Sequence, residues 1–187
     1  MLERAFFTIA VLLSLSVFIA TGQSVAEQKE KQVRVLCSFL PIYAFAQNVV
    51  GGAKNVELRC LLPPNVSLHD YALTPGDMKK IASAELFIIN GLGIEDFLGK
   101  AINEANPGIK VVETSQGIKS ILTRGAEAAD KEHHYGRYNP HTWVSPKAAI
   151  VQVRNIQKAL SDADPANASL YKSNADKYAA KLQSLVD

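Results

Sequence analysis

Short apolar runs alternate with amphipathic stretches along the first part of the chain. Runs rich in β-branched and aliphatic side chains predict strands, and stretches with helical spacing of apolar positions predict helices. The predicted strands span residues 33–39, 56–62, 86–90 and 110–113, and the predicted helices span residues 41–50, 75–83 and 95–104. Pro41 and Pro75 open the first two helices, and Thr74 provides an N-cap for the second.

The order of these elements predicts the fold class. Strand and helix alternate three times before position 115, which implies crossover connections between parallel strands. The strand runs are apolar throughout rather than alternating, as is typical of strands buried on both faces. We therefore predict an α/β fold with a four-stranded, mainly parallel sheet flanked by helices.

The pattern changes after residue 115. Residues 115–139 are mostly polar or small and predict a loop, and a helix is predicted from Ser145 to about residue 161. A last amphipathic helix is predicted over residues 166–187 and reaches the final residue without a stop signal. We therefore expect a chain cut within a helix that lacks a packing partner and leaves apolar surface exposed.

The first residues resemble a secretory signal. Arg4 precedes an apolar run over residues 5–20, and Ser24-Val25-Ala26 fits the rule for signal peptidase, so we expect cleavage before Glu27. An uncleaved membrane anchor is the alternative, which the shortness of the run disfavours. No cysteine stands near this junction, so a lipid anchor is not expected and a periplasmic location is.

Composition adds limits rather than chemistry. The chain has 187 residues, 48% hydrophobic and 20% charged, with a formal charge of +2, which gives no reason to expect nucleic acid as a partner. In an exported protein Cys37 and Cys60 can form a disulfide or remain two buried thiols. The sequence leaves both alternatives open.

Histidines provide the candidate chemistry. His69 follows the second predicted strand, and His141 follows the fourth across the long loop. Ligands bind at the carboxyl edge of such sheets, and imidazole is a common zinc ligand. Two histidines at one edge could supply half of a four-coordinate site. From these residues alone, a metal site and two solvated loop histidines both remain open.

Two motifs resemble those of a known family. Residues 61–77, LLPPNVSLHDYALTPGD, are similar to a signature of the ABC transporter solute-binding proteins that carry zinc or manganese. Residues 139–146, NPHTWVSP, resemble the second motif of that family, in which a histidine after proline is followed by an aromatic residue two positions on. The last helix resembles the start of the helix that joins the two lobes, so the resemblance covers residues 33–187.

The resemblance implies a ligand set and a domain plan. His69 and His141 match the first two metal ligands of the family, which takes its remaining ligands from a second lobe. We accordingly expect a signal peptide over residues 1–26, an α/β metal-binding lobe over 27–164, and the start of a linker helix over 165–187, with the second lobe absent.

Neighbouring residues receive supporting roles. Asn139 stands where the family often has aspartate, and its amide can still accept a hydrogen bond and orient a ligand. Asp70 either bonds a ligand imidazole or caps a turn, and Trp143 is expected to pack. His133 and His134 are a candidate accessory metal site, although a solvated loop is favoured there.

The resemblance also implies a function without catalysis. We expect the substrate-binding component of an ABC importer, a monomer that captures Zn²⁺, with Mn²⁺ as the alternative, and delivers it to a permease in the inner membrane. The alternatives are a manganese- or iron-specific binding protein, a surface adhesin of the same fold and, less favoured, a zinc hydrolase. Against the hydrolase, the sequence contains no HExxH or GxSxG motif.

Overall fold

Four parallel strands form the middle layer of the structure. The computed structural model describes residues 32–68, 71–119 and 138–186. Within them the strands are β1 (Val33–Cys37), β2 (Val56–Cys60), β3 (Leu86–Ile89) and β4 (Lys110–Glu113), in the spatial order β2-β1-β3-β4. Every pair of neighbouring strands is parallel, which confirms the predicted α/β fold with a four-stranded parallel sheet.

Burial separates the two central strands from the two edge strands. β1 and β3 are almost completely buried, as their uninterrupted apolar runs predict, whereas β2 and β4 are half-buried or exposed. β2 ends at Cys60, two residues before the end of its predicted range. Pairing with β1 nevertheless continues, since the amides of Leu61 and Leu62 donate to the carbonyls of Cys37 and Ser38.

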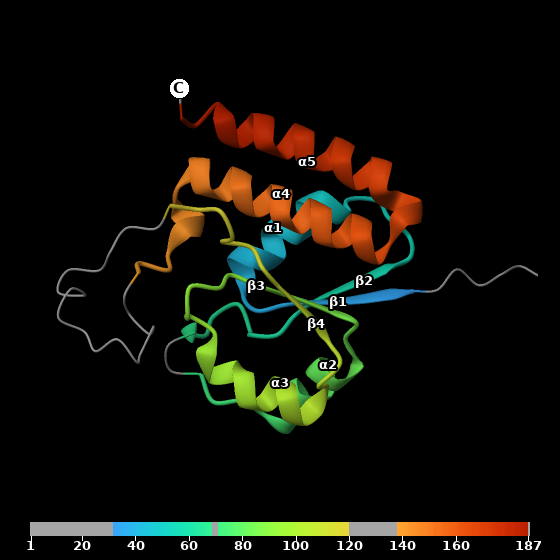
Figure 1. Cartoon of the computed structure of the whole chain (residues 1–187), viewed down its shortest axis with the longest axis vertical. Coiled ribbons are helices and arrows are strands. Elements are labelled where there is room, and N and C mark those ends of the chain that lie inside the picture. The colour runs from blue at the N-terminus through green and yellow to red at the C-terminus, as the bar shows by residue number, and fades with distance from the viewer. Residues whose placement is uncertain (1–31, 69–70, 120–137, 187) are drawn as a thin grey trace, which may run out of the picture.

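Helices cover both faces of this sheet (Figure 1). α1 (Leu40–Val50), α4 (Pro146–Ala163) and α5 (Ala168–Gln183) lie on one face, and α2 (Pro75–Ser83) and α3 (Gly99–Ala105) lie on the other. Three short 3₁₀ helices, Asp96–Leu98, Thr142–Val144 and Pro165–Asn167, precede α3, α4 and α5. The predicted helix over residues 95–104 therefore begins as a 3₁₀ turn.

The last helix packs on the rest of the structure. α5 contacts both α4 and α1, and it buries Tyr171, Ala175 and Ala179. The Nδ2 of Asn174 donates to the carbonyl of Val49 at 3.0 Å, which joins α5 to the end of α1. The expectation that this helix lacks a packing partner is therefore wrong. It also ends at Gln183 rather than continuing to the final residue.

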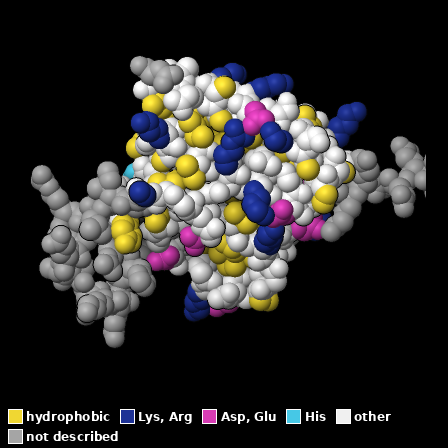
Figure 2. Space-filling model, turned by 45° about the horizontal axis from the view of Figure 1, so that its top comes forward, with side chains coloured by type: hydrophobic (Ala, Val, Ile, Leu, Met, Phe, Trp, Pro, Cys, Tyr) yellow, Lys and Arg dark blue, Asp and Glu magenta, His cyan; other side chains and the backbone are white. Residues whose placement is uncertain are grey.

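Charged side chains of both signs are interspersed on the surface. Lys158 pairs with Asp162 on α4 at 2.8 Å, and Lys172 pairs with Asp176 on α5 at 2.9 Å. On the face shown in Figure 2, the basic side chains lie among acidic and apolar ones. In the part of the chain that the structure describes, no helix has the length and apolarity needed to cross a membrane. The apolar run at residues 5–20 lies outside that part.

The two cysteines lie opposite one another on neighbouring strands. The register pairs Cys37 of β1 with Cys60 of β2, and both are free thiols. Cys37 is buried and Cys60 is half-buried, and burial raises the pKa of both thiols. Of the two alternatives that the sequence leaves open, the structure therefore has the reduced pair.

Candidate metal site

The strand order places a switch point between β1 and β3. The chain leaves β1 toward β2 on one side and later builds β3 and β4 on the other side. In sheets of this kind, ligands bind outside the carboxyl ends of the strands at such a point. Two buried polar residues occupy it, Ser38 directly after β1 and Asn90 directly after β3.

Glu95 joins these two strand ends. Its Oε1 accepts hydrogen bonds from Ser38 Oγ at 2.8 Å and from the Asn90 amide at 2.7 Å, and its Oε2 accepts one from the Gly91 amide at 2.9 Å. The residue is 5% exposed. Burial raises the pKa of Glu95 to about 7, because desolvation outweighs the three hydrogen bonds that favour the carboxylate.

The loop between Asn90 and Glu95 requires an unusual backbone. Gly91 has φ +86°, and a Cβ there would lie 2.8 Å from Glu113 Oε2 and 2.9 Å from Ser115 Oγ. Only glycine combines that φ with so close an approach. This tight loop returns the chain so that the Glu95 carboxylate reaches the amides of Asn90 and Gly91.

His141 lies at the same edge of the sheet. The chain enters β1 from the right in Figure 1, so the carboxyl ends of the strands lie to the left, where residues 138–145 lead into α4. The side chain is exposed, and its Nδ1 lies 2.9 Å from Asn139 Oδ1, which also accepts the His141 amide at 3.0 Å. Because an amide oxygen only accepts, Nδ1 is the donor in this contact.

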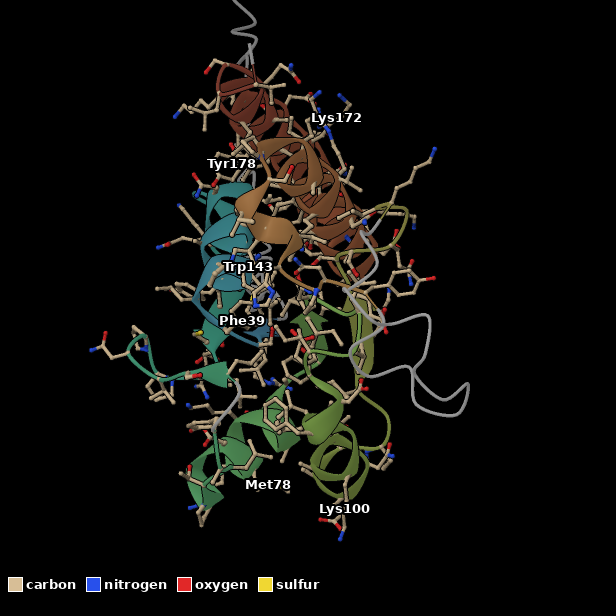
Figure 3. All side chains as sticks on the ribbon, turned by 90° about the vertical axis from the view of Figure 1, so that its left-hand side faces the viewer. Phe39, Met78, Lys100, Trp143, Lys172 and Tyr178 are labelled. Carbon is tan, nitrogen blue, oxygen red and sulfur yellow. The ribbon has the colours of Figure 1, made fainter. Side chains whose placement is uncertain are left out.

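The His141 ring packs against Trp143, which in turn packs against Phe39. The Trp143 ring lies 5.1 Å from the His141 ring and meets Phe39 edge to face at 4.8 Å. Figure 3 shows Phe39 and Trp143 side by side, one following β1 and the other preceding α4. Trp143 is partly buried against the hydrophobic core, which confirms its predicted packing role. A hollow of about 220 Å³ opens beside His141 and is also lined by Asn139, Thr142 and Val144.

The segment that carries His69 is described only on either side of that residue. His69, Asp70, His133 and His134 all lie outside the described residues. Tyr71, two positions after His69, donates from its hydroxyl to Asp77 Oδ2 at 2.5 Å. Asp77 also forms a capping box with Thr74 at the start of α2, so Tyr71 is bonded to the first turn of that helix.

Asp77 is a buried carboxylate held in its charged form. It is 2% exposed, and its Oδ1 lies 3.0 Å from the Lys80 ammonium. Burial acts to raise the pKa of Asp77, but hydrogen bonds from Tyr71, Thr74 and Lys80 outweigh it and lower the pKa to about 2. The N-terminus of α2 favours the same charge.

Within residues 32–68, 71–119 and 138–186, no three histidine, cysteine, aspartate or glutamate side chains gather closely enough to hold a metal ion. His141 is the only histidine in those ranges. An ion bound there must therefore take its other ligands from residues outside them, from water or from another polypeptide. The pairing of His141 with His69 stays a prediction.

Three functional candidates near His141 escape sequence reasoning. Ser38, Asn90 and Glu95 lie at the switch point, but each is an ordinary polar residue in the sequence. A fourth, Gln152, is fully buried on α4. The available signal is a polar side chain placed directly after an apolar strand, or on the apolar face of a helix, where burial requires hydrogen-bond partners.

The structure is thus an α/β lobe with a histidine exposed at the edge where sheets of this kind bind ligands. The model of the family described as zinc-uptake complex component A, periplasmic, matches residues 35–187. The chain belongs to this family.

Curated relatives carry names with different metals. The chain is 34% identical over 181 residues to the iron-binding protein YfeA of Yersinia pestis, covering 97% of the chain and 55% of that protein. It is also 34% identical over 170 residues to the high-affinity zinc uptake system protein ZnuA of Bacillus subtilis, covering 86% and 51%. The chain thus spans about half the length of these curated relatives.

Solved structures share the fold. A Mn-bound periplasmic metal binding protein from Candidatus Liberibacter asiaticus aligns with a TM-score of 0.69 at 31% identity, over 80% of this chain and 53% of that one. The solute-binding protein FpvC from Pseudomonas aeruginosa, in complex with Ni²⁺, aligns with a TM-score of 0.71 at 31% identity, over 83% and 52%. The fold and family of this chain are therefore those of periplasmic metal-binding proteins.

Proposed function

We propose that this chain captures a divalent metal ion, zinc in the first place, for delivery to the permease of an ABC importer, with His69 and His141 as ligands. The observation that carries the proposal is the geometry of His141. Its imidazole is exposed at the carboxyl edge of a parallel sheet, and its Nδ1 donates to Asn139 Oδ1. Hydrogen bonding of the second ring nitrogen is the usual arrangement for a metal-bound histidine.

The choice of zinc rests on ligand chemistry. Imidazole ligands suit zinc, whereas manganese prefers sites richer in oxygen. Iron, zinc, manganese and nickel all appear in the names of similar proteins. The competing proposal is therefore a manganese- or iron-specific protein of the same family, which a competition between ions distinguishes. Asn139 in place of an aspartate can still orient the His141 ring, but it leaves the site without one negative charge, which lowers the affinity for any divalent cation.

The site itself is tested by calorimetric titration. Zn²⁺ and Mn²⁺ are titrated into residues 27–187, into a His69→Ala, His141→Ala variant, and into a His133→Ala, His134→Ala variant as the matched control. We expect zinc to bind more tightly than manganese, the first variant to lose zinc binding and the control to retain it. Binding that survives in the first variant and disappears in the control would place the ion at His133 and His134 instead.

We also propose that the chain is exported and cleaved before Glu27, and that it then acts as a monomer without a lipid. Some similar proteins are named lipoproteins, for example that of Lactococcus lactis. The first cysteine of this sequence, Cys37, is buried within β1 and could not carry a lipid in this fold. Mass spectrometry of the exported protein should find an unmodified amino terminus at Glu27. A lipid-modified or uncleaved terminus would contradict the proposal.

A further inference from the structure

The Asn90 side chain contacts both neighbours of His141. Its Nδ2 donates to the Pro140 carbonyl at 2.9 Å, and its Oδ1 accepts a hydrogen bond from Thr142 Oγ1 at 3.2 Å. Nδ2 also donates to the carbonyl of Gly91 at 2.9 Å. A single buried amide at the end of β3 therefore holds the residue before His141 and the residue after it.

Gln152 fixes the orientation of that amide. Its Nε2 donates to Asn90 Oδ1 and to Thr114 Oγ1, both at 2.9 Å. With two donors directed at Oδ1, the Asn90 amide must direct Nδ2 toward the Pro140 carbonyl. Thr114 directly follows β4, so this network joins the ends of β3 and β4 to α4 and to the His141 segment.

Gln152 also retains an unfavourable feature. The side chain is fully buried, and its Oε1 has no hydrogen-bond partner among the residues that the structure describes. A buried acceptor left unsatisfied lowers the stability of the folded state. The reverse orientation of the amide would place Oε1 against Asn90 Oδ1, which is worse because both atoms are acceptors. The two hydrogen bonds that Gln152 donates are therefore retained together with an unsatisfied acceptor.

We propose that Asn90 is a positioning residue for metal binding. Its hydrogen bonds to Pro140 and Thr142 position the His141 imidazole between them, and Gln152 orients the Asn90 amide. The inference rests on the proposed function, because it assigns a role at the same site. Without these two hydrogen bonds, the His141 segment would have to become ordered when the ion binds, which lowers the affinity for the ion. Residues that support metal ligands through hydrogen bonds typically change affinity by about 10- to 100-fold.

Two variants separate positioning from stability. Asn90→Asp keeps an acceptor for Thr142 and Gln152 but places a carboxylate oxygen, with no proton to donate, against the Pro140 carbonyl. Gln152→Met removes the hydrogen bond to Asn90 and the one to Thr114. It also removes the unsatisfied Oε1, which offsets part of the expected loss of stability. It keeps the proposal testable if Asn90→Asp fails to fold.

Asn106→Ala is the matched control. The Nδ2 of Asn106 also donates to backbone carbonyls, including that of Ala84 at 2.9 Å, but near the amino end of β3. It should lower stability without changing the affinity for the ion, because it lies at the opposite end of that strand from Asn90.

The experiment measures the zinc dissociation constant, urea unfolding and the ring nitrogen chemical shifts of His141 by NMR for each variant. We expect Asn90→Asp and Gln152→Met to weaken zinc binding at least about 10-fold and to shift the Nδ1 signal, and Asn106→Ala to do neither. Unchanged affinity and ring signals in both network variants would overturn the inference.

Failure of the proposed function would look different. If the His141→Ala variant bound zinc as tightly as the unaltered chain, the assignment of His141 as a ligand would be wrong. The NMR signals of His141 without metal would then still decide whether Asn90 positions the ring. A change of those signals in the network variants supports positioning, and constant signals refute it.

Discussion

At the scale of single residues, the two buried carboxylates Asp77 and Glu95 have opposite pKa shifts. Asp77 lies at the N-terminus of α2 beside Lys80, and its pKa is lowered to about 2. Glu95 lies at the switch point with Glu113 nearby, and burial raises its pKa to about 7. The same functional group therefore has a different protonation preference at each position, and each preference predicts a different dependence of stability on pH.

Glu95 should make the protein less stable as the pH rises toward 8. Its folded pKa of about 7 exceeds its ordinary value of 4.5, so its stabilising effect is complete below pH 4.5 and is lost as the pH rises through 7. The difference is about 3 kcal/mol at most. Urea unfolding between pH 5 and 8 measures it, and Glu95→Gln should lack this slope.

Glu104→Gln is the control for that measurement, since the Glu104 side chain is 60% exposed. It should follow the unaltered protein at every pH. A slope that is identical in Glu95→Gln and in the unaltered protein would show that the carboxyl group of Glu95 does not titrate in this range.

Asp77→Ala should destabilise the protein by roughly 2–3 kcal/mol near neutral pH, because it removes the capping box and the acceptor of the Tyr71 hydroxyl, and leaves Lys80 with only the Leu61 carbonyl. The Asp77 contribution is present above pH 3.8 and is lost as the pH falls through about 2. Thermal or urea unfolding measures the loss.

Asp96→Ala is the control. It removes an exposed aspartate from a 3₁₀ helix and should change stability by less than about 0.5 kcal/mol. Equal losses in the two variants would contradict the role of the capping box.

At the scale of elements, local signals in the sequence predict most of the fold. The capping residues Thr74 and Asp77 and the proline at position 75 locate α2, which spans Pro75–Ser83 as predicted. Strands β1 and β3 follow from their apolar runs because both are buried in the centre of the sheet. These signals are sufficient because each depends on residues close together in the chain.

Features that depend on distant residues could not be predicted in the same way. Gln152 lies on the apolar face of α4, and its contacts with Asn90 and Thr114, 62 and 38 positions away, explain it. The packing of α5 on α1 has the same origin, since its amphipathic pattern shows that a face is buried but not against which element. His141 is a ligand candidate through the resemblance of its motif, since its imidazole alone left both alternatives open, whereas its contact network required the structure.

The packing of α5 predicts a large effect of Tyr171→Ala. Tyr171 is fully buried, and its hydroxyl donates to Asp164 just before this helix. Replacing a large buried aromatic side chain by alanine typically costs about 3–5 kcal/mol, and Tyr171→Phe should cost only about 1 kcal/mol. Urea unfolding measures both. Leu185→Ala is the control, because Leu185 is 70% exposed beyond the end of α5. Equal effects of Tyr171→Ala and Leu185→Ala would mean that α5 contributes little to the stability of the lobe.

At the scale of the whole molecule, the strand order and helix α4 bring polar residues together at one edge of the sheet. The order β2-β1-β3-β4 brings Ser38 and Asn90 together, and α4 brings Gln152 to the same place. The side chains of Asn90, Gln152 and Thr114 are buried and hydrogen-bonded to one another, whereas His141 is exposed to solvent. An ion bound at the ring would therefore interact with the folded state, and its binding energy would appear as added stability.

Zinc should consequently raise the melting temperature of residues 27–187. An ion that binds only the folded state at 100 times its dissociation constant adds about 2.7 kcal/mol, which is about 5–10 °C for a protein of this size.

Differential scanning calorimetry with zinc, with manganese and with excess EDTA measures this shift. His141→Ala should lose it while melting at the same temperature as the unaltered chain in EDTA, since His141 is exposed and its removal leaves the core intact. A zinc shift of equal size in His141→Ala would mean that the stabilising ion binds elsewhere. The exposed imidazole would then have no part in metal capture, however well Asn139 orients it.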